Sequence, residues 1–313
     1  MVSINTVTGK LNINDLGCTL VHEHLLLRSE VVTFQFPHLY DEDVIYKKAV
    51  EGANAVKSQG VKTICDPTVV GMGRDVRFLE RVANETDMQI VTATGIYSFT
   101  DIPYYFQNRE IDHMAEAFIH DIEKGIQNTN IKAGFLKCSA DAPGLTQDLE
   151  KVFRAVARAH KSTGVPIMTH SHPETENGLN QLAIFEEEGV NLKSVMIGHT
   201  GDSTDLNYIH KILDKGAYIG MDRYGQGPLP ATKRNEVLLQ LLKEGLEKRI
   251  FLSQDYCCNI DWYTQESIDE IIPGWSIRFL IDEILPQLQK EGVTDQQIHT
   301  MMHENIRNWI IGI

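Results

Sequence analysis

The chain has 313 residues, of which 42% are hydrophobic and 23% are charged. This composition is typical of a globular protein that can bury a sizeable core, and it argues against disorder. The formal net charge of -14 disfavours nucleic acid and anionic membranes as partners, because both attract basic surfaces.

Features that report on cellular location are few. The first residues, MVSINTVTGK, show neither a secretory signal nor a transit-peptide pattern, and the longest apolar runs are too short to span a bilayer. The five cysteines are odd in number and scattered, which makes a poor disulfide framework. We therefore expect a cytoplasmic protein.

Eight short runs rich in β-branched residues alternate with longer segments of helical spacing. The candidate strands are residues 19–25, 61–68, 90–98, 133–141, 166–171, 194–201, 217–225 and 250–256. Repeated βα units predict a closed parallel (β/α)8 TIM barrel of the α/β class, with an open doubly wound sheet as the alternative. We expect a single domain over residues 1–313, with 1–17 as a short N-terminal extension and 294–310 as a final helix.

The first predicted strand contains TLVHEHL, in which two histidines flank a glutamate. Side chains alternate between the two faces of a strand, so His22 and His24 share one face and Glu23 points to the other. Taken alone, this motif is equally consistent with a pair of hydrogen-bonded core histidines.

Other chemically unusual residues fall near the ends of later predicted strands. Lys137 ends the fourth, His170 the fifth, His199 the sixth and Asp255 the eighth. Barrel enzymes build their sites at this rim, and imidazole and carboxylate suit zinc and similar divalent ions. Because one ion needs only three or four protein ligands, the whole set suggests two ions that share a bridging group. Zinc is the expected metal, with cobalt, iron and manganese as alternatives.

A lysine in such a site needs its own explanation. An ammonium beside two dications would be strongly repelled, so Lys137 must be neutral or modified. A neutral amine can add carbon dioxide to form a carbamate, whose two oxygens can bridge two metals. The alternative is a salt bridge on the barrel rim.

These residues lie within longer stretches that carry a family resemblance. The stretches span residues 19 to 262 and read TLVHEHL, DPTVVGMGRD, GIYSFTDIP, the LK of AGFLKCSAD, THS, IGHTGD, DRYG, and the DYCC and IDW of SQDYCCNIDW. The chain resembles the amidohydrolase superfamily, specifically the phosphotriesterase family and its lactonase branch.

The resemblance implies a ligand set for each of the two metal ions, and the family's habit suggests a homodimer. His22, His24 and Asp255 would bind the more buried ion. The more exposed ion would be bound by His170 and His199. Carboxylated Lys137 and a hydroxide would bridge the two ions.

Two further residues point to the lactonase branch. The tyrosine matching Tyr97 lies beside the metal centre in that branch and contacts the bound lactone, and the arginine matching Arg223 packs near it. The alternative for Tyr97 is a rim aromatic that supports its strand. The family pattern uses only the first histidine of THSH, so we expect His172 in a loop.

Apolar residues after the last two predicted strands could accommodate an acyl chain. Cys257 and Trp262 follow the eighth strand, and Pro228 to Pro230 follow the seventh. We expect Cys257 and Trp262 to contact substrate, although an apolar rim is equally compatible with a dimer interface.

The implied activity is the opening of small-molecule lactones, such as N-acyl homoserine lactones or other hydrophobic lactones, by a metal-bridging hydroxide. Asp255 would pass the proton of that hydroxide to the leaving alkoxide, while Tyr97 could stabilise the carbonyl oxygen. Weak hydrolysis of paraoxon-type phosphotriesters and a role in quorum quenching are further expectations. The alternatives are a phosphotriesterase, carboxylesterase or amidase on the same ions, and a metal-binding barrel without catalysis.

Overall fold

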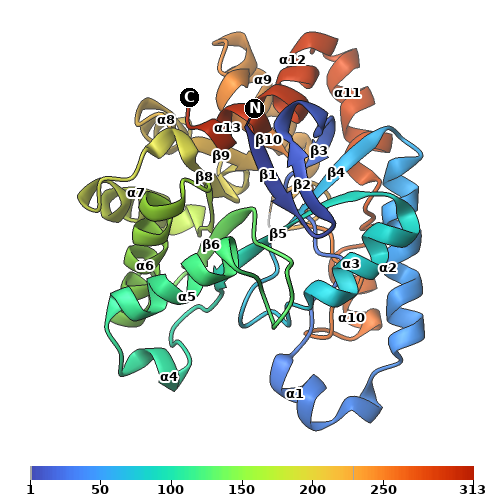
Figure 1. Cartoon of the computed structure of the whole chain (residues 1–313). Coiled ribbons are helices and arrows are strands. Elements are labelled where there is room, and N and C mark those ends of the chain that lie inside the picture. The colour runs from blue at the N-terminus through green and yellow to red at the C-terminus, as the bar shows by residue number, and fades with distance from the viewer. Residues whose placement is uncertain (1, 228) are drawn as a thin grey trace.

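The computed structural model describes residues 2–227 and 229–313, in which strands and helices alternate along most of the chain (Figure 1). Its strands are β1 (Ser3–Thr6), β2 (Gly9–Asn12), β3 (Cys18–Leu20), β4 (Val61–Asp66), β5 (Gln89–Ile96), β6 (Phe135–Ser139), β7 (Ile167–His170), β8 (Val195–Gly198), β9 (Tyr218–Met221) and β10 (Ile250–Leu252). Its α-helices are α1 (Glu30–Gln35), α2 (Glu42–Lys57), α3 (Val76–Thr86), α4 (Tyr104–Gln107), α5 (Ile111–Glu123), α6 (Gln147–Thr163), α7 (Asn177–Glu187), α8 (Leu206–Asp214), α9 (Ala231–Lys243), α10 (Gln265–Ile271), α11 (Leu285–Lys290), α12 (Asp295–His299) and α13 (Asn305–Ile311).

The predicted barrel is confirmed. Strands β3 to β10 form one eight-stranded sheet in sequence order, and every printed pairing within it is parallel. The alternative of a doubly wound sheet is wrong, because the consecutive order has no point at which the winding reverses. The N-terminal extension contains the antiparallel hairpin β1–β2.

The observed strands are shorter than the predicted ones at their carboxyl ends. The first predicted strand covers 19–25, whereas β3 ends at Leu20, and the last covers 250–256, whereas β10 ends at Leu252. Beyond these points the chain leaves the regular ladder and turns into rim loops. His22, His24 and Asp255 therefore follow strands instead of lying inside them.

These post-strand segments nevertheless join the first and last strands of the barrel. The backbone N–H of Asp255 donates to the carbonyl of His22 at 3.0 Å, and that of His24 donates to the carbonyl of Tyr256 at 2.8 Å. Cys258 donates in turn to His24 at 2.8 Å. The seam that closes the barrel is thus built from the same segments that carry candidate metal ligands.

The opposite end of the barrel is plugged by aromatic side chains. Trp309, on α13, lies with its ring centroid 5.9 Å from that of Phe135 and 5.9 Å from that of Phe251. Tyr218 stacks on Phe251 at 4.9 Å, and Trp309 is fully buried. This packing leaves the carboxyl ends of the strands as the face on which a site can open.

Helix α6 illustrates why the outer helices form where they do. The Thr146 hydroxyl accepts the N–H of Leu149 at its start, and Gly164 adopts a left-handed φ of 76° at its end. Buried Leu149, Val152 and Val156 recur at helical spacing and face the sheet. Each such side chain contributes about 1.5–3 kcal/mol through burial.

Helix α13 completes a helical run that begins with α12. Thr294 caps α12 through a reciprocal capping box, and a π-helical turn over Thr300–Glu304 joins the two helices. Within the described residues no helix is long and apolar enough to cross a membrane. All five cysteines are free, in agreement with their odd, scattered pattern.

Candidate active site

The carboxyl ends of the strands surround a cavity of about 330 Å³. Every residue that the sequence analysis proposes as a metal ligand lines it. They come from five strands of the barrel or the segments that follow them, and are His22, His24, Lys137, His170, His199 and Asp255.

Three of these residues converge closely enough to hold one ion. Oδ1 of Asp255 lies 3.4 Å from Nε2 of His22 and 3.3 Å from Nε2 of His24. Tetrahedral zinc with bonds of about 2.0–2.1 Å separates its ligand atoms by about 3.3–3.4 Å. Both separations match those around a single ion, and the ligand atoms of all three side chains lie within 4.8 Å of one another.

His170 and His199 form a second group that lines the same cavity. Nδ1 of His170 lies 2.9 Å from Nε2 of His199, and both side chains are buried. Burial lowers the pKa of His170 to about 4 and that of His199 well below its ordinary value. Both rings are neutral at pH 7, so each keeps a lone pair for a metal.

Behind the candidate ligands lies a layer of hydrogen-bond acceptors that orient them. Asp222 accepts from Nδ1 of His22 at 2.7 Å, and Asp141 lies 2.7 Å from Nε2 of His170. His24 is similarly paired through Nδ1 with the hydroxyl of a threonine at 2.7 Å, namely Thr68. Such partners set the tautomer and direction of ligating histidines.

Asp222 also belongs to a group that could hold a metal itself, together with His22 and His199. We assign it to orientation, because it faces Nδ1 of His22 and leaves Nε2 directed at Asp255. Asp222 was not predicted as a site residue, because it lay inside the predicted strand 217–225, whereas β9 ends at Met221 and Asp222 directly follows it.

Lys137 is almost completely buried and sits on β6, within the cavity wall. Burial lowers the pKa of its ammonium to about 8, and Nζ lies 3.5 Å from the carbonyl of Thr169. Among the described residues it forms no ion pair, so the rim salt bridge is not observed. Gly95 on β5 allows the strands to approach here, because a Cβ at this position would lie 1.8 Å from the Lys137 carbonyl.

Asp255 is held in place by an arginine. Nε of Arg223 donates to Oδ2 of Asp255 at 3.1 Å, and Nη1 donates to Asp202 at 3.1 Å. Asp202 in turn pairs with Arg234, whose side chain is fully buried. Burial alone would raise the pKa of Asp255, but His22 and Arg223 are among the neighbours that hold it well below its ordinary value.

Tyr97 lies directly beside the histidine pair. Its hydroxyl is 3.4 Å from Nδ1 of His170, and its ring lies 5.9 Å from that of Trp262 and 5.2 Å from that of Phe99. Burial raises the pKa of Tyr97, so the phenol stays protonated. The expected lactone-binding residues Tyr97, Arg223, Cys257 and Trp262 all line the cavity, while their roles stay predictions.

His172 lies outside the cavity, in a loop as expected. Its Nδ1 is 3.2 Å from the hydroxyl of Thr175, and its side chain is partly exposed. A second histidine from THSH is therefore absent from the ligand cluster.

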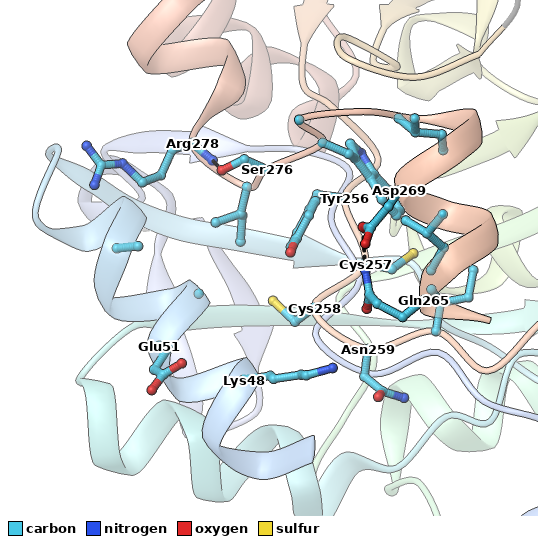
Figure 2. A pocket seen from close by; sticks show the side chains of 18 residues that line it. Lys48, Glu51, Tyr256, Cys257, Cys258, Asn259, Gln265, Asp269, Ser276 and Arg278 are labelled. Atoms are coloured by element: carbon cyan, nitrogen blue, oxygen red, sulfur yellow. Dashed lines mark hydrogen bonds between the residues drawn. The ribbon is translucent and has the colours of Figure 1, made fainter. Parts of the chain in front are cut away.

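A second cavity, of about 510 Å³, is also lined by the segment that follows β10 (Figure 2). Helix α2 lines one side and α10 the other. Cys257 borders both cavities, whereas Cys258 borders only the second. A Cβ on Gly52 of α2 would lie 2.6 Å from Sγ of Cys258, so only glycine allows this close packing.

A third, apolar cavity of about 620 Å³ adjoins the central one on the side of α9. Arg223 and Gln226 line both, and Leu229, Pro230 and Ile271 line the outer one. Of the predicted Pro228 to Pro230 segment, Pro228 lies outside the described residues.

The barrel, with four histidines and a carboxylate gathered at its open rim, defines a metal-dependent hydrolase. The model of the phosphotriesterase family matches residues 2–310. An aryldialkylphosphatase from Saccharolobus solfataricus is 50% identical over 294 residues, which cover 93% of this chain and 94% of that protein. A phosphotriesterase homology protein from Mycobacterium tuberculosis is 41% identical over 316 residues, with 98% and 97% covered.

A solved structure agrees with these sequence comparisons. The phosphotriesterase structure from Mycobacterium tuberculosis superimposes with a TM-score of 0.95 at 40% identity, covering 99% of this chain and 98% of that one. The chain belongs to the phosphotriesterase family.

Proposed function

We propose that this hydrolase opens hydrophobic lactones, N-acyl homoserine lactones among them, to hydroxy acids. The observation that carries the proposal is the place of Tyr97, whose hydroxyl lies 3.4 Å from Nδ1 of His170 at the edge of the ligand cluster. Arg223 lines the same cavity, as the resemblance to the lactonase branch implies.

The donor set fits two divalent ions, with zinc expected first. His22, His24 and Asp255 would hold one ion, and the pair His170 and His199 the other. We also propose that Lys137 bridges them as a carbamate, since its buried amine is readily deprotonated. When bound, such ions polarise a carbonyl and lower the pKa of a coordinated water.

The residues of the chain have separate roles in the proposed reaction. The protonated Tyr97 hydroxyl donates a hydrogen bond to the lactone carbonyl oxygen as negative charge develops there. Asp255 accepts the proton of the attacking water and returns it to the ring oxygen when the C–O bond breaks. Arg223 holds Oδ2 of Asp255, which keeps Oδ1 directed at His22 and His24.

The remaining walls suit an apolar substituent on the lactone. Leu27, Met72 and Trp275 line the central cavity, and the adjoining cavity adds Leu229 and Phe279. Burying each methylene of an acyl chain contributes about 0.8 kcal/mol, so these surfaces favour long-chain substrates.

A second candidate is hydrolysis of phosphotriesters, with carboxylesters and amides as further options on the same ions. The name of the Saccharolobus relative favours phosphotriesters specifically. We propose this as a weaker activity, because Tyr97 and Arg223 both line the central cavity and the sequence resemblance assigns these two residues to the lactonase branch.

The test is an initial-rate comparison on protein reconstituted with zinc or cobalt. The substrates are a chain-length series of acyl homoserine lactones, a chromogenic phosphotriester, and matched carboxylester and amide substrates. Tyr97→Phe is the variant, with metal content measured in both proteins. The expected result is fast lactone turnover, a slower phosphotriester rate and a lactone kcat/KM that falls about 10-fold or more in the variant.

Absence of lactone turnover in the metal-loaded protein would contradict the lactonase assignment. The activity would then be assigned from whichever of the other substrates reacts. Lactone turnover that is indifferent to Tyr97→Phe would leave Tyr97 as a rim aromatic.

A further inference from the structure

Glu23 lies between two candidate metal ligands but takes no part in the proposed chemistry. Its side chain is fully buried, and it does not line the central cavity. It therefore points away from His22 and His24, as strand alternation predicts. A carboxylate is costly to bury, so its surroundings must supply specific partners.

Those partners all come from the segment after β10. Oε1 of Glu23 accepts the hydroxyl of Ser253 at 2.7 Å and the backbone N–H of Gln254 at 3.1 Å. Oε2 accepts the backbone N–H of Tyr256 at 2.8 Å. Among the described residues Glu23 has no ion-pair partner. The two carboxylate oxygens thus accept hydrogen bonds from residues on both sides of Asp255 in the chain.

The residue between these anchors has an unusual backbone. Asp255 has a φ of 51°, in the left-handed region that non-glycine residues rarely occupy. Such conformations persist where surrounding contacts over-determine them. Here the Asp255 N–H also donates to the carbonyl of His22, and the His22 N–H donates to the hydroxyl of Ser253 at 3.1 Å.

The two segments therefore hold each other in register across the barrel seam. His22 is tied to Ser253 and Asp255 through its backbone, and Glu23 is tied to the same turn through its side chain. In this arrangement Oδ1 of Asp255 lies 3.3–3.4 Å from Nε2 of the two histidines.

We propose that Glu23 is a positioning residue, whose carboxylate holds the left-handed turn at Asp255 and thereby sets how tightly the buried metal ion is retained. The inference rests on the metal centre of the proposed function and is independent of the substrate. It would stand equally for a lactonase and for a phosphotriesterase.

The variants that test it are Glu23→Gln and Glu23→Ala. Glutamine keeps one acceptor oxygen, but its NH2 group faces an N–H or hydroxyl donor and cannot accept from it. Alanine removes both acceptors. We expect metal loss to a chelator to be about 10–100-fold faster in Glu23→Ala and intermediate in Glu23→Gln.

Two readouts separate positioning from general stability. The first is the rate at which cobalt-loaded protein loses metal to a chelator, and the second is the visible absorption spectrum of the bound cobalt. The matched control is Asp121→Asn, because Asp121 also holds a hydroxyl, that of Thr94, and pairs with Arg74, but lies outside the cavity. It should lower thermal stability without changing the cobalt spectrum or the metal-loss rate.

Folded Glu23→Ala protein with the wild-type spectrum and metal-loss rate would overturn the proposal. If that variant fails to fold, Ser253→Ala replaces it, since it removes one donor to Glu23 from the opposite side; unchanged metal retention there would overturn the proposal as well. Wild-type protein that binds no cobalt or zinc would instead refute the metal centre itself.

Discussion

Asp222 fixes the tautomer of His22. Its Oδ2 accepts a hydrogen bond from Nδ1 of His22 at 2.7 Å, and its Oδ1 accepts the backbone N–H of His199 at 2.7 Å. With Nδ1 of His22 as donor, Nε2 carries the lone pair and faces Asp255. One buried carboxylate thus contacts two candidate ligands that follow different strands, β3 and β8.

Replacing this carboxylate should weaken the metal site. In Asp222→Asn the amide oxygen can still accept from the His199 backbone, which leaves the NH2 group facing Nδ1 of His22. His22 would then place its proton on Nε2 and lose the lone pair needed for a metal. We expect metal affinity to fall about 10–100-fold, measured by competition with a chromogenic chelator.

The control for this variant is Asp269→Asn, an exposed carboxylate of the second cavity. It should retain metal as the wild type does. Equal affinity in Asp222→Asn and the wild type would show that Asp222 does not determine the His22 tautomer.

Lys137 should make metal uptake dependent on pH and bicarbonate. Burial lowers the pKa of Lys137 to about 8, so the neutral amine becomes populated as pH rises through that value. At pH 7 roughly a tenth would be neutral, against well under about 0.1% at the ordinary pKa. We expect apoprotein to take up zinc faster as pH rises from about 7 to 9, and faster with added bicarbonate.

The measurement is the initial rate of zinc uptake by metal-free protein in degassed buffer, with and without bicarbonate. Lys137→Met is the control, because it cannot form a carbamate and should show no bicarbonate effect. Bicarbonate-independent uptake by the wild type would argue against the modified lysine.

The barrel could be predicted from sequence because its signal is periodic and repeated. Each buried parallel strand needs a β-branched or apolar run, and each covering helix needs an apolar stripe. The strand ends could not be predicted as well, because the residues after Leu20 and Leu252 keep an extended pattern while leaving the ladder. Alternation along an extended chain still predicts that His22 and His24 share one face.

The layer behind the ligands was not predicted, for a physical reason. Asp222 and His22 are 200 residues apart, and Thr68 and His24 are 44 apart, so only the closed barrel brings them together. Nothing in the local pattern distinguishes Asp222 from any other acidic residue after a strand. Glu23 shows the same limit, since alternation gives its direction but not its partners.

The adjoining apolar cavity should determine preference for long acyl chains. Ile271 lines it, and its side chain is 68% exposed, so a substitution there should not disturb folding. A charge in Ile271→Glu would oppose burial of an alkyl chain. We expect kcat/KM for a long-chain lactone to fall about 10-fold, with short-chain lactones within about twofold of wild type.

The assay compares the two chain lengths in wild type, Ile271→Glu and the control Ile311→Glu. Ile311 is also an exposed isoleucine, but it lies at the C-terminal end of α13 and lines none of the three cavities described here. A uniform loss across chain lengths in Ile271→Glu would place the acyl chain elsewhere.

Helix α1 and the turn that follows it expose apolar side chains, and we expect a second copy of the chain to cover them. Val31 is 74%, Phe34 82% and Leu39 64% exposed, and α1 lies at the periphery of the molecule (Figure 1). Exposed apolar groups gathered in one segment mark interaction surfaces. We expect a homodimer that Phe34→Glu converts to monomer, measured by sedimentation equilibrium. The control is Tyr104→Glu, which changes an equally exposed aromatic residue of α4 and should leave the protein dimeric. A monomeric wild type would contradict the prediction. A dimeric Phe34→Glu variant would show that the interface lies on another surface.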